Sequence, residues 1–254
     1  MAASTSHRIR VVLHFTETTQ PGELAGLVRS LNGKVDALAA TGLDHHEVTL
    51  AVQELKGAGI PTFSLLSDFA QGVRESYVGL NNLKVGRAVG WLMAKLASKK
   101  GKVGIFVGGS RFHGHELRET GFRSSLREYA PHLELLNPQV NMENRQYTYE
   151  ATVQMLEDHE DLAGIYCAGG GMEGAIAAAR ELRKPGDVVL IVNELTEESR
   201  MALQDGTVSI VVGTPLRHMC EDLRTMMIAA AERGMSPTPG QHFLPSEIWT
   251  PESL

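Results

Sequence analysis

The 254-residue sequence is poor in cysteine and has no long hydrophobic run, and each absence excludes a class of protein. Two cysteines, Cys167 and Cys220, are too few for a disulfide framework. No apolar stretch approaches the roughly 20 residues of a transmembrane helix, and the first residues lack the apolar core of a signal peptide. A net charge of −6 gives no basic footprint for nucleic acid over the whole chain. The sequence therefore predicts a cytoplasmic globular protein with no membrane partner.

Short apolar runs alternate with amphipathic segments over most of the chain. Runs such as Ile9–Phe15, Val35–Ala40 and Pro61–Leu66 are continuous, which is typical of strands buried on both faces. The segments between them carry apolar residues at helical spacing. This alternation predicts an α/β protein with parallel sheets covered by helices. About eight to ten expected strands are many for one small sheet, so we expect two doubly wound lobes that meet near residues 76–82.

Residues 103–122 combine a strand, a glycine turn and a helix. The apolar run Val103–Val107 stops at Gly108–Ser110, and the following helix carries Arg118 in its first turns, where the helix dipole disfavours a cation. His115 lies on the same line of this helix, three residues earlier. A cation at this position indicates an anionic or hydroxyl-rich partner at the strand ends. An arginine that extends along the helix to solvent explains it equally well.

Polar side chains also follow other predicted strands. They are Asp44, which is in addition a plausible N-cap, Asp68, and the pair Asn193 and Glu194. Because ligands bind at the carboxyl ends of parallel strands, we expect these residues to contact a ligand together with Arg118. Carboxylates and an arginine suit a polyhydroxylated molecule. No nucleophile–base pair is evident, so binding without catalysis is favoured.

The motifs allow two other interpretations, a dinucleotide site and a metal site. Gly169–Gly174 matches G-x-G-x-x-G, and Glu194 follows about twenty residues later, as in a dinucleotide site. This makes an NAD-dependent oxidoreductase the alternative function, although such a motif normally opens its domain. His45–Glu47 and His113–Glu116 contain metal-ligand types but no H-E-x-x-H spacing, and they fit polar helix starts better. The sequence therefore predicts no metal and no cofactor.

Several stretches, taken in order and spacing, carry a family resemblance over most of residues 8–254. They are GIPTFSLLSD (59–68), YVGLNNLKVGRAVGWLM (77–93), GKVGIFVGG (101–109), HELRETGFRSSLRE (115–128), DLAGIYCAGGG (161–171), VVLIVNELT (188–196) and LQDGTVSIVV (203–212). Together they resemble the ligand-binding region of LacI-type transcriptional regulators, which is similar to periplasmic sugar-binding proteins.

The resemblance implies a sugar- or polyol-sensing effector domain that works as a homodimer through its lobe faces. One lobe would comprise residues 8–80 plus 213–238, and the other 82–212 plus 239–254, with the ligand in a cleft between them. By position, Asp68 and Arg118 match the family's contacts to sugar hydroxyls, and Glu194 falls where the family has an acidic pocket residue. Ligand binding would close the lobes. Operator DNA would be bound only through a segment that this sequence lacks.

Three departures from the family pattern affect these expectations. The family's region normally opens with a further strand and helix, so the first βα unit is expected to be missing and strand edges to be left unpaired. Gly213 stands where many relatives carry a polar side chain, and the Gly169–Gly171 turn lacks the common Asn-Asp. The resemblance therefore implies a class of ligand but not its identity.

Overall fold

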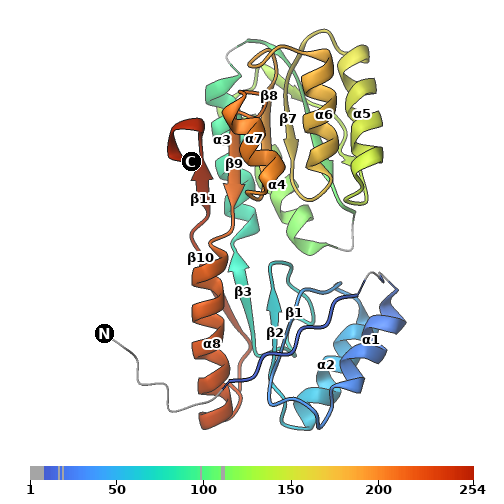
Figure 1. Ribbon diagram of the computed structural model, residues 1–254, viewed down its shortest axis with the longest axis vertical. Helices are drawn as coiled ribbons and strands as arrows, with labels where there is room; N and C mark the ends of the chain where they lie inside the picture. The colour runs from blue at the N-terminus through green and yellow to red at the C-terminus, as the bar shows by residue number, and fades with distance from the viewer. Residues whose placement is uncertain (1–8, 17, 19, 98, 110–111) are drawn as a thin grey trace. The chain divides into compact units, whose positions relative to one another are not determined.

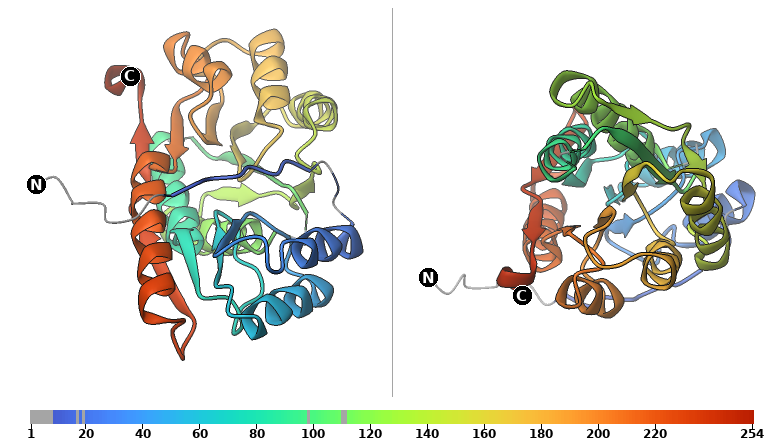
Figure 2. Two further views of the ribbon diagram at one scale, coloured as in Figure 1. Left: turned by 60° about the horizontal axis from the view of Figure 1, so that its bottom comes forward. Right: turned by 90° about the horizontal axis from the view of Figure 1, so that it is seen from above.

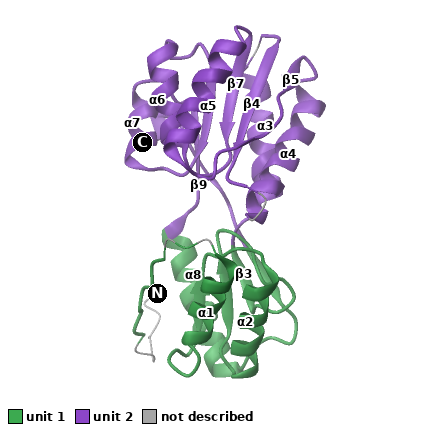
Figure 3. Cartoon of the chain, turned by 90° about the vertical axis from the view of Figure 1, so that its right-hand side faces the viewer, with its two compact units in different colours: residues 1–78, 217–242 green, residues 79–216, 243–254 purple. Residues whose placement is uncertain are grey.

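The computed structural model describes residues 9–16, 18, 20–97, 99–109 and 112–254, which form two compact units (Figure 3). Unit 1 comprises residues 1–78 and 217–242, and unit 2 comprises residues 79–216 and 243–254. Each unit is built on its own sheet, and helices separate most of the strands. This confirms the predicted α/β fold with parallel sheets in two lobes. Ser110, at the end of the predicted glycine turn, lies outside the described residues.

Unit 1 contains a sheet in the order β1-β2-β3-β10, with β1 parallel to β2 and β2 parallel to β3 (Figure 1). The strands are β1 (Leu38–Ala40), β2 (Thr62–Leu65), β3 (Ser76–Leu80) and β10 (Gly240–Leu244). The helices are α1 (Pro21–Ser30), α2 (His46–Gly57) and α8 (Leu216–Arg233). Helices α1 and α2 pack together over a core that includes Ala25, Val52 and Leu55.

Unit 2 contains a sheet in the order β11-β9-β8-β7-β4-β5, and β6 also pairs with β4. Its strands are β4 (Gly101–Val107), β5 (Leu133–Leu135), β6 (Gln139–Val140), β7 (Leu162–Cys167), β8 (Val189–Asn193), β9 (Ile210–Gly213) and β11 (Glu247–Trp249). Its helices are α3 (Asn82–Leu96), α4 (His113–Tyr129), α5 (Arg145–Asp158), α6 (Met172–Leu182) and α7 (Glu197–Gln204), with a short 3-10 helix at Pro251–Ser253. Every strand pair is parallel except β11 with β9. Figure 2 shows the sheet between α3 and α4 on one face and α5, α6 and α7 on the other, so this unit is doubly wound.

Three local predictions differ from the structure. Ile9–Phe15 forms no strand and is drawn as coil in Figure 1, because an apolar run becomes a strand only where another strand pairs with its backbone. The predicted strand Val35–Ala40 is regular only from Leu38. Asp44 does not cap α2, since the side chain of His45 accepts the hydrogen bond from the Glu47 N–H instead.

Helices α3 and α4 touch through their backbones at two glycines. A Cβ atom on Gly86 would lie 2.0 Å from the carbonyl oxygen of Arg118, and one on Gly121 would lie 2.2 Å from the carbonyl oxygen of Leu83. Any side chain at either position would push the helices apart. This close approach fixes the part of α4 that carries His115 and Arg118. In the described part of the chain, no helix is both long enough and apolar enough to cross a bilayer.

We expect Gly86→Ala to lower the free energy of unfolding by about 1–3 kcal/mol, because the added methyl group overpacks a backbone contact that cannot relax cheaply. Urea denaturation at constant m-value measures the change. Gly26→Ala in α1 is the matched control, since a Cβ there meets no atom within 4 Å and alanine favours the helix by about 0.5–1 kcal/mol. Equal effects of the two substitutions would contradict the packing argument.

Candidate functional site

Arg118 is buried in unit 2 at the carboxyl ends of the central strands, with only 8% of its surface exposed. Its Nε donates to Oδ1 of Asn82, the first residue of α3, at 2.7 Å. Its Nη1 donates to the carbonyl oxygen of Ala168, directly after β7, also at 2.7 Å. The guanidinium therefore joins α3, α4 and the end of β7, and it does not extend to solvent along the helix.

His115 lies one helical turn before Arg118 and is held as a neutral hydrogen-bond donor. The Gly108 N–H donates to its Nδ1 at 3.1 Å. Burial, and secondly the charge of Arg118, lower the pKa of His115 to about 4. Because Nδ1 accepts a hydrogen bond in the neutral ring, we assign the proton to Nε2. That nitrogen lies 3.6 Å from Oε1 of Glu143, too far for a direct hydrogen bond.

Two glutamates at this edge have left-handed backbone conformations, which residues other than glycine rarely adopt. Glu143, between β6 and α5, has φ 56°, and Glu194, after β8, has φ 70°. The Gly170 N–H donates to Oε1 of Glu143 at 3.2 Å. Thr214 donates to both carboxylate oxygens of Glu194, from its N–H at 2.9 Å and its hydroxyl at 2.8 Å. Non-glycine residues held at positive φ concentrate at functional sites, so both carboxylates are candidates for ligand contact.

The side chain of Asn193 is buried and hydrogen-bonds to the two neighbouring strands. Only 2% of its surface is exposed, its Oδ1 accepts from the Tyr166 hydroxyl at 2.8 Å, and its Nδ2 donates to the carbonyl oxygen of Val212 at 3.4 Å. These contacts join the ends of β7, β8 and β9. Asn193 therefore orients the backbone from which Glu194 projects.

The other two predicted residues lie in unit 1. Asp68 is buried in a fork with Arg74, whose Nε donates to Oδ1 and whose Nη2 donates to Oδ2 at 2.6 Å. The Ser64 hydroxyl adds a third hydrogen bond to Oδ1 at 2.7 Å. Asp44 is exposed in the loop before α2. The structure thus brings His115, Arg118, Asn193 and Glu194 to one edge of the unit 2 sheet, while Asp68 is engaged in a buried ion pair.

Glu143 belongs to this edge but was not among the predicted residues. The strand before it, β6, has only two residues, so its apolar signal is too short to identify. Its backbone strain and its approach to His115 are both tertiary features. The one signal in the sequence was a carboxylate three residues after the apolar residue Val140, which is too weak to use alone.

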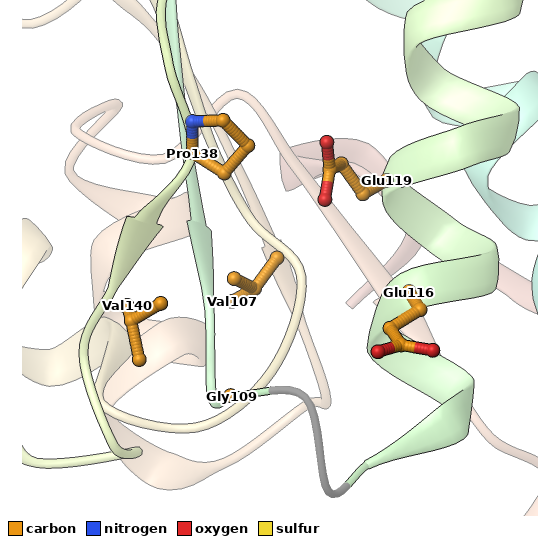
Figure 4. A pocket seen from close by; sticks show the side chains of 6 residues that line it. All are labelled: Val107, Gly109, Glu116, Glu119, Pro138 and Val140. Atoms are coloured by element: carbon orange, nitrogen blue, oxygen red, sulfur yellow. The ribbon is translucent and has the colours of Figure 1, made fainter.

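A pocket near this edge is lined by apolar and acidic residues only (Figure 4). It is lined by Val107, Gly109, Glu116, Glu119, Pro138 and Val140. Figure 4 shows the two glutamates of α4 facing the apolar side chains of the strand side. Arg123 already donates to Glu119 at 3.0 Å. Because the lining side chains offer acceptors and no donors, the pocket suits a polyol less well than the Arg118 edge does.

The Gly169–Gly171 turn is occupied by side chains of the protein itself. A Cβ atom on Gly169 would lie 2.3 Å from Cε1 of His115, one on Gly170 would lie 3.0 Å from Cβ of Glu143, and one on Gly171 would lie 2.5 Å from the hydroxyl of Thr148. The glycines therefore make room for His115, Glu143 and Thr148. A bound pyrophosphate is therefore not needed to explain these three glycines. This weakens the alternative function, an NAD-dependent oxidoreductase.

Among the described residues, one group of three has metal-ligand spacing, namely His45, His46 and Glu47 in unit 1, with ligand atoms within 4.8 Å of one another. The Glu47 N–H donates to Nδ1 of His45, which makes this residue the N-cap of α2. The positive end of the helix dipole disfavours a cation at this place. The N-cap of α2 explains why His45, His46 and Glu47 lie close together without a metal ion.

Comparison with known proteins identifies the family. Residues 2–234 match the periplasmic binding protein domain. The chain belongs to this family. It is 23% identical to the D-apiose import binding protein of Paraburkholderia graminis over 65% of this chain and 53% of that protein. It is 24% identical to the D-ribose/D-allose-binding protein of Pseudomonas aeruginosa over 76% of this chain and 62% of that protein. The chain thus spans less than two thirds of each of these curated relatives.

Solved structures of sugar-binding proteins share the fold. An ABC transporter solute-binding protein from Burkholderia graminis, in complex with D-arabinose, superimposes with a TM-score of 0.85 at 19% identity, over 92% of this chain and 82% of that one. GanP, a glucose-galactose binding protein from Geobacillus stearothermophilus, gives a TM-score of 0.82 at 20% identity, over 91% and 82% of the two chains. At these identities the likeness shows the fold alone.

We expect stability to fall between about pH 6.5 and pH 4 because of His115. In this window the unfolded chain binds a proton at the histidine that the folded protein does not bind, so acid favours unfolding. The full effect is at most about 3 kcal/mol. His115→Gln removes this term, so the slope of unfolding free energy against pH, measured by urea denaturation, is expected to be smaller in the variant. Identical slopes would show that His115 titrates alike in both states.

Proposed function

We propose that this chain binds a sugar or polyol at the carboxyl-end edge of the unit 2 sheet. The main observation behind this proposal is the buried guanidinium of Arg118, which is held by Asn82 and Ala168 where the central strands end. The family supports the proposal, and so do the names of the curated relatives, which are a D-apiose import binding protein and a D-ribose/D-allose-binding protein. A solute-binding protein of the same fold has been solved in complex with D-arabinose.

The edge offers both donors and acceptors, which hydroxyl groups require. In the described part of the chain, Nε and Nη1 of Arg118 have partners while Nη2 has none, so Nη2 is available as a donor. His115 supplies a second donor at Nε2, because its low pKa keeps the ring neutral at pH 7. Glu143 and Glu194 supply acceptors. Asp44 and Asp68 remain predicted contacts.

The proposed role is binding without catalysis and without a cofactor. His115 is the nearest candidate for a general base, but a pKa of about 4 makes it a poor proton acceptor at pH 7. Burial raises the pKa of the Cys167 thiol well above its usual value, so this residue is no nucleophile. Sugar-binding proteins such as the relatives named above carry out no reaction on their ligand.

The finer proposal is that the chain is the effector domain of a LacI-type transcriptional regulator in the cytoplasm, active as a homodimer. It rests on the seven ordered stretches of resemblance, and DNA would be bound through a separate segment. The alternative is a carrier for sugar import, which the names of the relatives favour. Fractionation of the native cells distinguishes the two. Recovery of the protein with the cytoplasm supports the regulator, and recovery outside the inner membrane supports the carrier.

The binding proposal predicts that one sugar family raises the melting temperature of the protein. A panel of D-ribose, D-allose, D-apiose, D-arabinose, D-galactose, sorbitol and NAD is measured by thermal shift and then by calorimetry. Ligand at a hundredfold excess over Kd stabilises the folded state by about 2.7 kcal/mol. In Arg118→Ala the shift is expected to disappear. This variant should also be less stable by about 1–3 kcal/mol, since the carbonyl of Ala168 loses its donor.

Arg87→Ala is the matched control. It removes an arginine of the same unit whose side chain is 40% exposed and pairs with Glu128 on the surface. This variant is expected to keep the full ligand shift. A shift with NAD alone, or sugar binding at wild-type affinity in Arg118→Ala, would overturn the proposed site.

A further inference from the structure

His115 and Glu143 approach each other without forming a hydrogen bond. Nε2 of His115 lies 3.6 Å from Oε1 of Glu143, and the two side chains are 12% and 38% exposed. A direct N–H···O hydrogen bond requires a shorter separation, about 2.7–3.2 Å. Both residues belong to unit 2, so the gap between their polar atoms is a feature of that unit alone.

The two side chains converge over Gly108, directly after β4. A Cβ atom on Gly108 would lie 2.8 Å from Cγ of Glu143 and 2.9 Å from Nδ1 of His115, so the glycine makes room for both residues. The Gly108 N–H also donates to Nδ1 of His115, which leaves the proton of the neutral ring on Nε2. Nε2 is therefore a donor, and among the described residues no acceptor lies within hydrogen-bond distance of it.

The turn Asn141–Asn144 carries the Glu143 carboxylate opposite this donor. The Asn144 N–H donates to the carbonyl oxygen of Asn141 at 2.9 Å, and the two central residues, Met142 and Glu143, have φ 52° and 56°. Positive φ at both central residues is the pattern of a type I′ turn, in which glycine, asparagine and aspartate dominate. Two residues with longer side chains hold this conformation here, so the surrounding contacts must enforce it.

The side chain of Asn141 supplies these contacts and is 2% exposed. Its Oδ1 accepts from the Glu143 N–H at 3.0 Å, and its Nδ2 donates to the Thr148 hydroxyl and to the Gly170 carbonyl oxygen, both at 2.9 Å. The Gly170 N–H in turn donates to Oε1 of Glu143 at 3.2 Å. Backbone N–H groups, at Gly108 and Gly170, thus hold the groups on both sides of the gap.

We propose that His115 and Glu143 bind one and the same hydroxyl group of the ligand. The inference rests on the proposed sugar site and specifies the chemistry of one of its contacts. The hydroxyl oxygen accepts from Nε2 of His115, and the hydroxyl hydrogen is donated to Oε1 of Glu143. An oxygen can lie about 2.8 Å from both atoms, since they are 3.6 Å apart.

This pair selects a ligand group that both accepts and donates. A hydroxyl does both, whereas an ammonium has no lone pair for His115 and an ionised carboxylate has no hydrogen for Glu143. A ligand that lacks the hydroxyl leaves both protein groups unpaired, which lowers affinity. At this position of the ligand, the site therefore prefers neutral sugars and polyols to sugar acids and amino sugars.

A double-mutant cycle tests whether the two groups share one hydroxyl. Calorimetry measures the affinities of D-ribose, D-allose and D-galactose for the wild type, His115→Phe, Glu143→Ala and the double variant. Each single variant is expected to bind sugar on the order of 10- to 100-fold more weakly, and the double variant no more than about threefold more weakly than the weaker single variant. Losses that multiply in the double variant, or wild-type affinity in either single variant, would overturn the inference.

Monodeoxy analogues of the sugar that binds give an independent measurement. The analogue that lacks the shared hydroxyl is expected to bind the wild type, His115→Phe and Glu143→Ala with affinities within about threefold of one another, because the contact is already lost. One analogue must cancel the effect of both variants. Cancellation of the two variants by two different analogues would show that each side chain binds its own hydroxyl.

Glu150→Gln is the control for the loss of one negative charge. Glu150 lies on the surface of α5, where its Oε1 accepts from the Gln146 side chain at 2.8 Å, and this variant is expected to keep wild-type affinity. Thermal melting without sugar checks that every variant is folded. A wild type that binds no sugar overturns the proposed function and this inference together, whereas sugar binding with multiplying losses overturns the shared hydroxyl alone.

Discussion

The hydrogen bonds of the Arg118 guanidinium are the interactions on which the candidate site depends. They join the start of α3, the start of α4 and the end of β7. They form only because Gly86 and Gly121 let the backbones of α3 and α4 touch. The same charge, added to burial, keeps His115 neutral and so makes its Nε2 a donor. A buried cation without these partners would cost several kcal/mol, so the site is fixed before a ligand arrives.

The two carboxylates near Arg118 and His115 are held in a different way. Glu143 and Glu194 both have positive φ, which costs on the order of 1–3 kcal/mol each and persists only where surrounding contacts enforce it. Gly170 and Thr214 supply those contacts through hydrogen bonds to the carboxylates. The combination of a rigid donor frame and strained acceptors is what a binding site for a polyhydroxylated ligand needs, because preorganised groups lose little entropy on binding.

Sequence reasoning identified most strands and helices because continuous apolar runs and helical spacing are local signals. It also placed Arg118 at the strand ends, since a cation in the first turns of a helix is unusual enough to notice. It was wrong for Ile9–Phe15, where local composition favours a strand but no strand among the described residues pairs with it. It missed Glu143, whose importance comes from a backbone conformation and from its approach to His115.

The sequence by itself determined the α/β class, the order of the elements and the position of Arg118, because each follows from side-chain periodicity or from one residue in its own helix. Tertiary structure decided which polar residues act together. Asp68 has both oxygens engaged by Arg74, whereas Glu194 is held by Thr214, directly after β9. Tertiary structure also decided that Ile9–Phe15 is exposed. A strand is stable only when another strand satisfies its backbone groups, and that neighbour is not encoded in the segment itself.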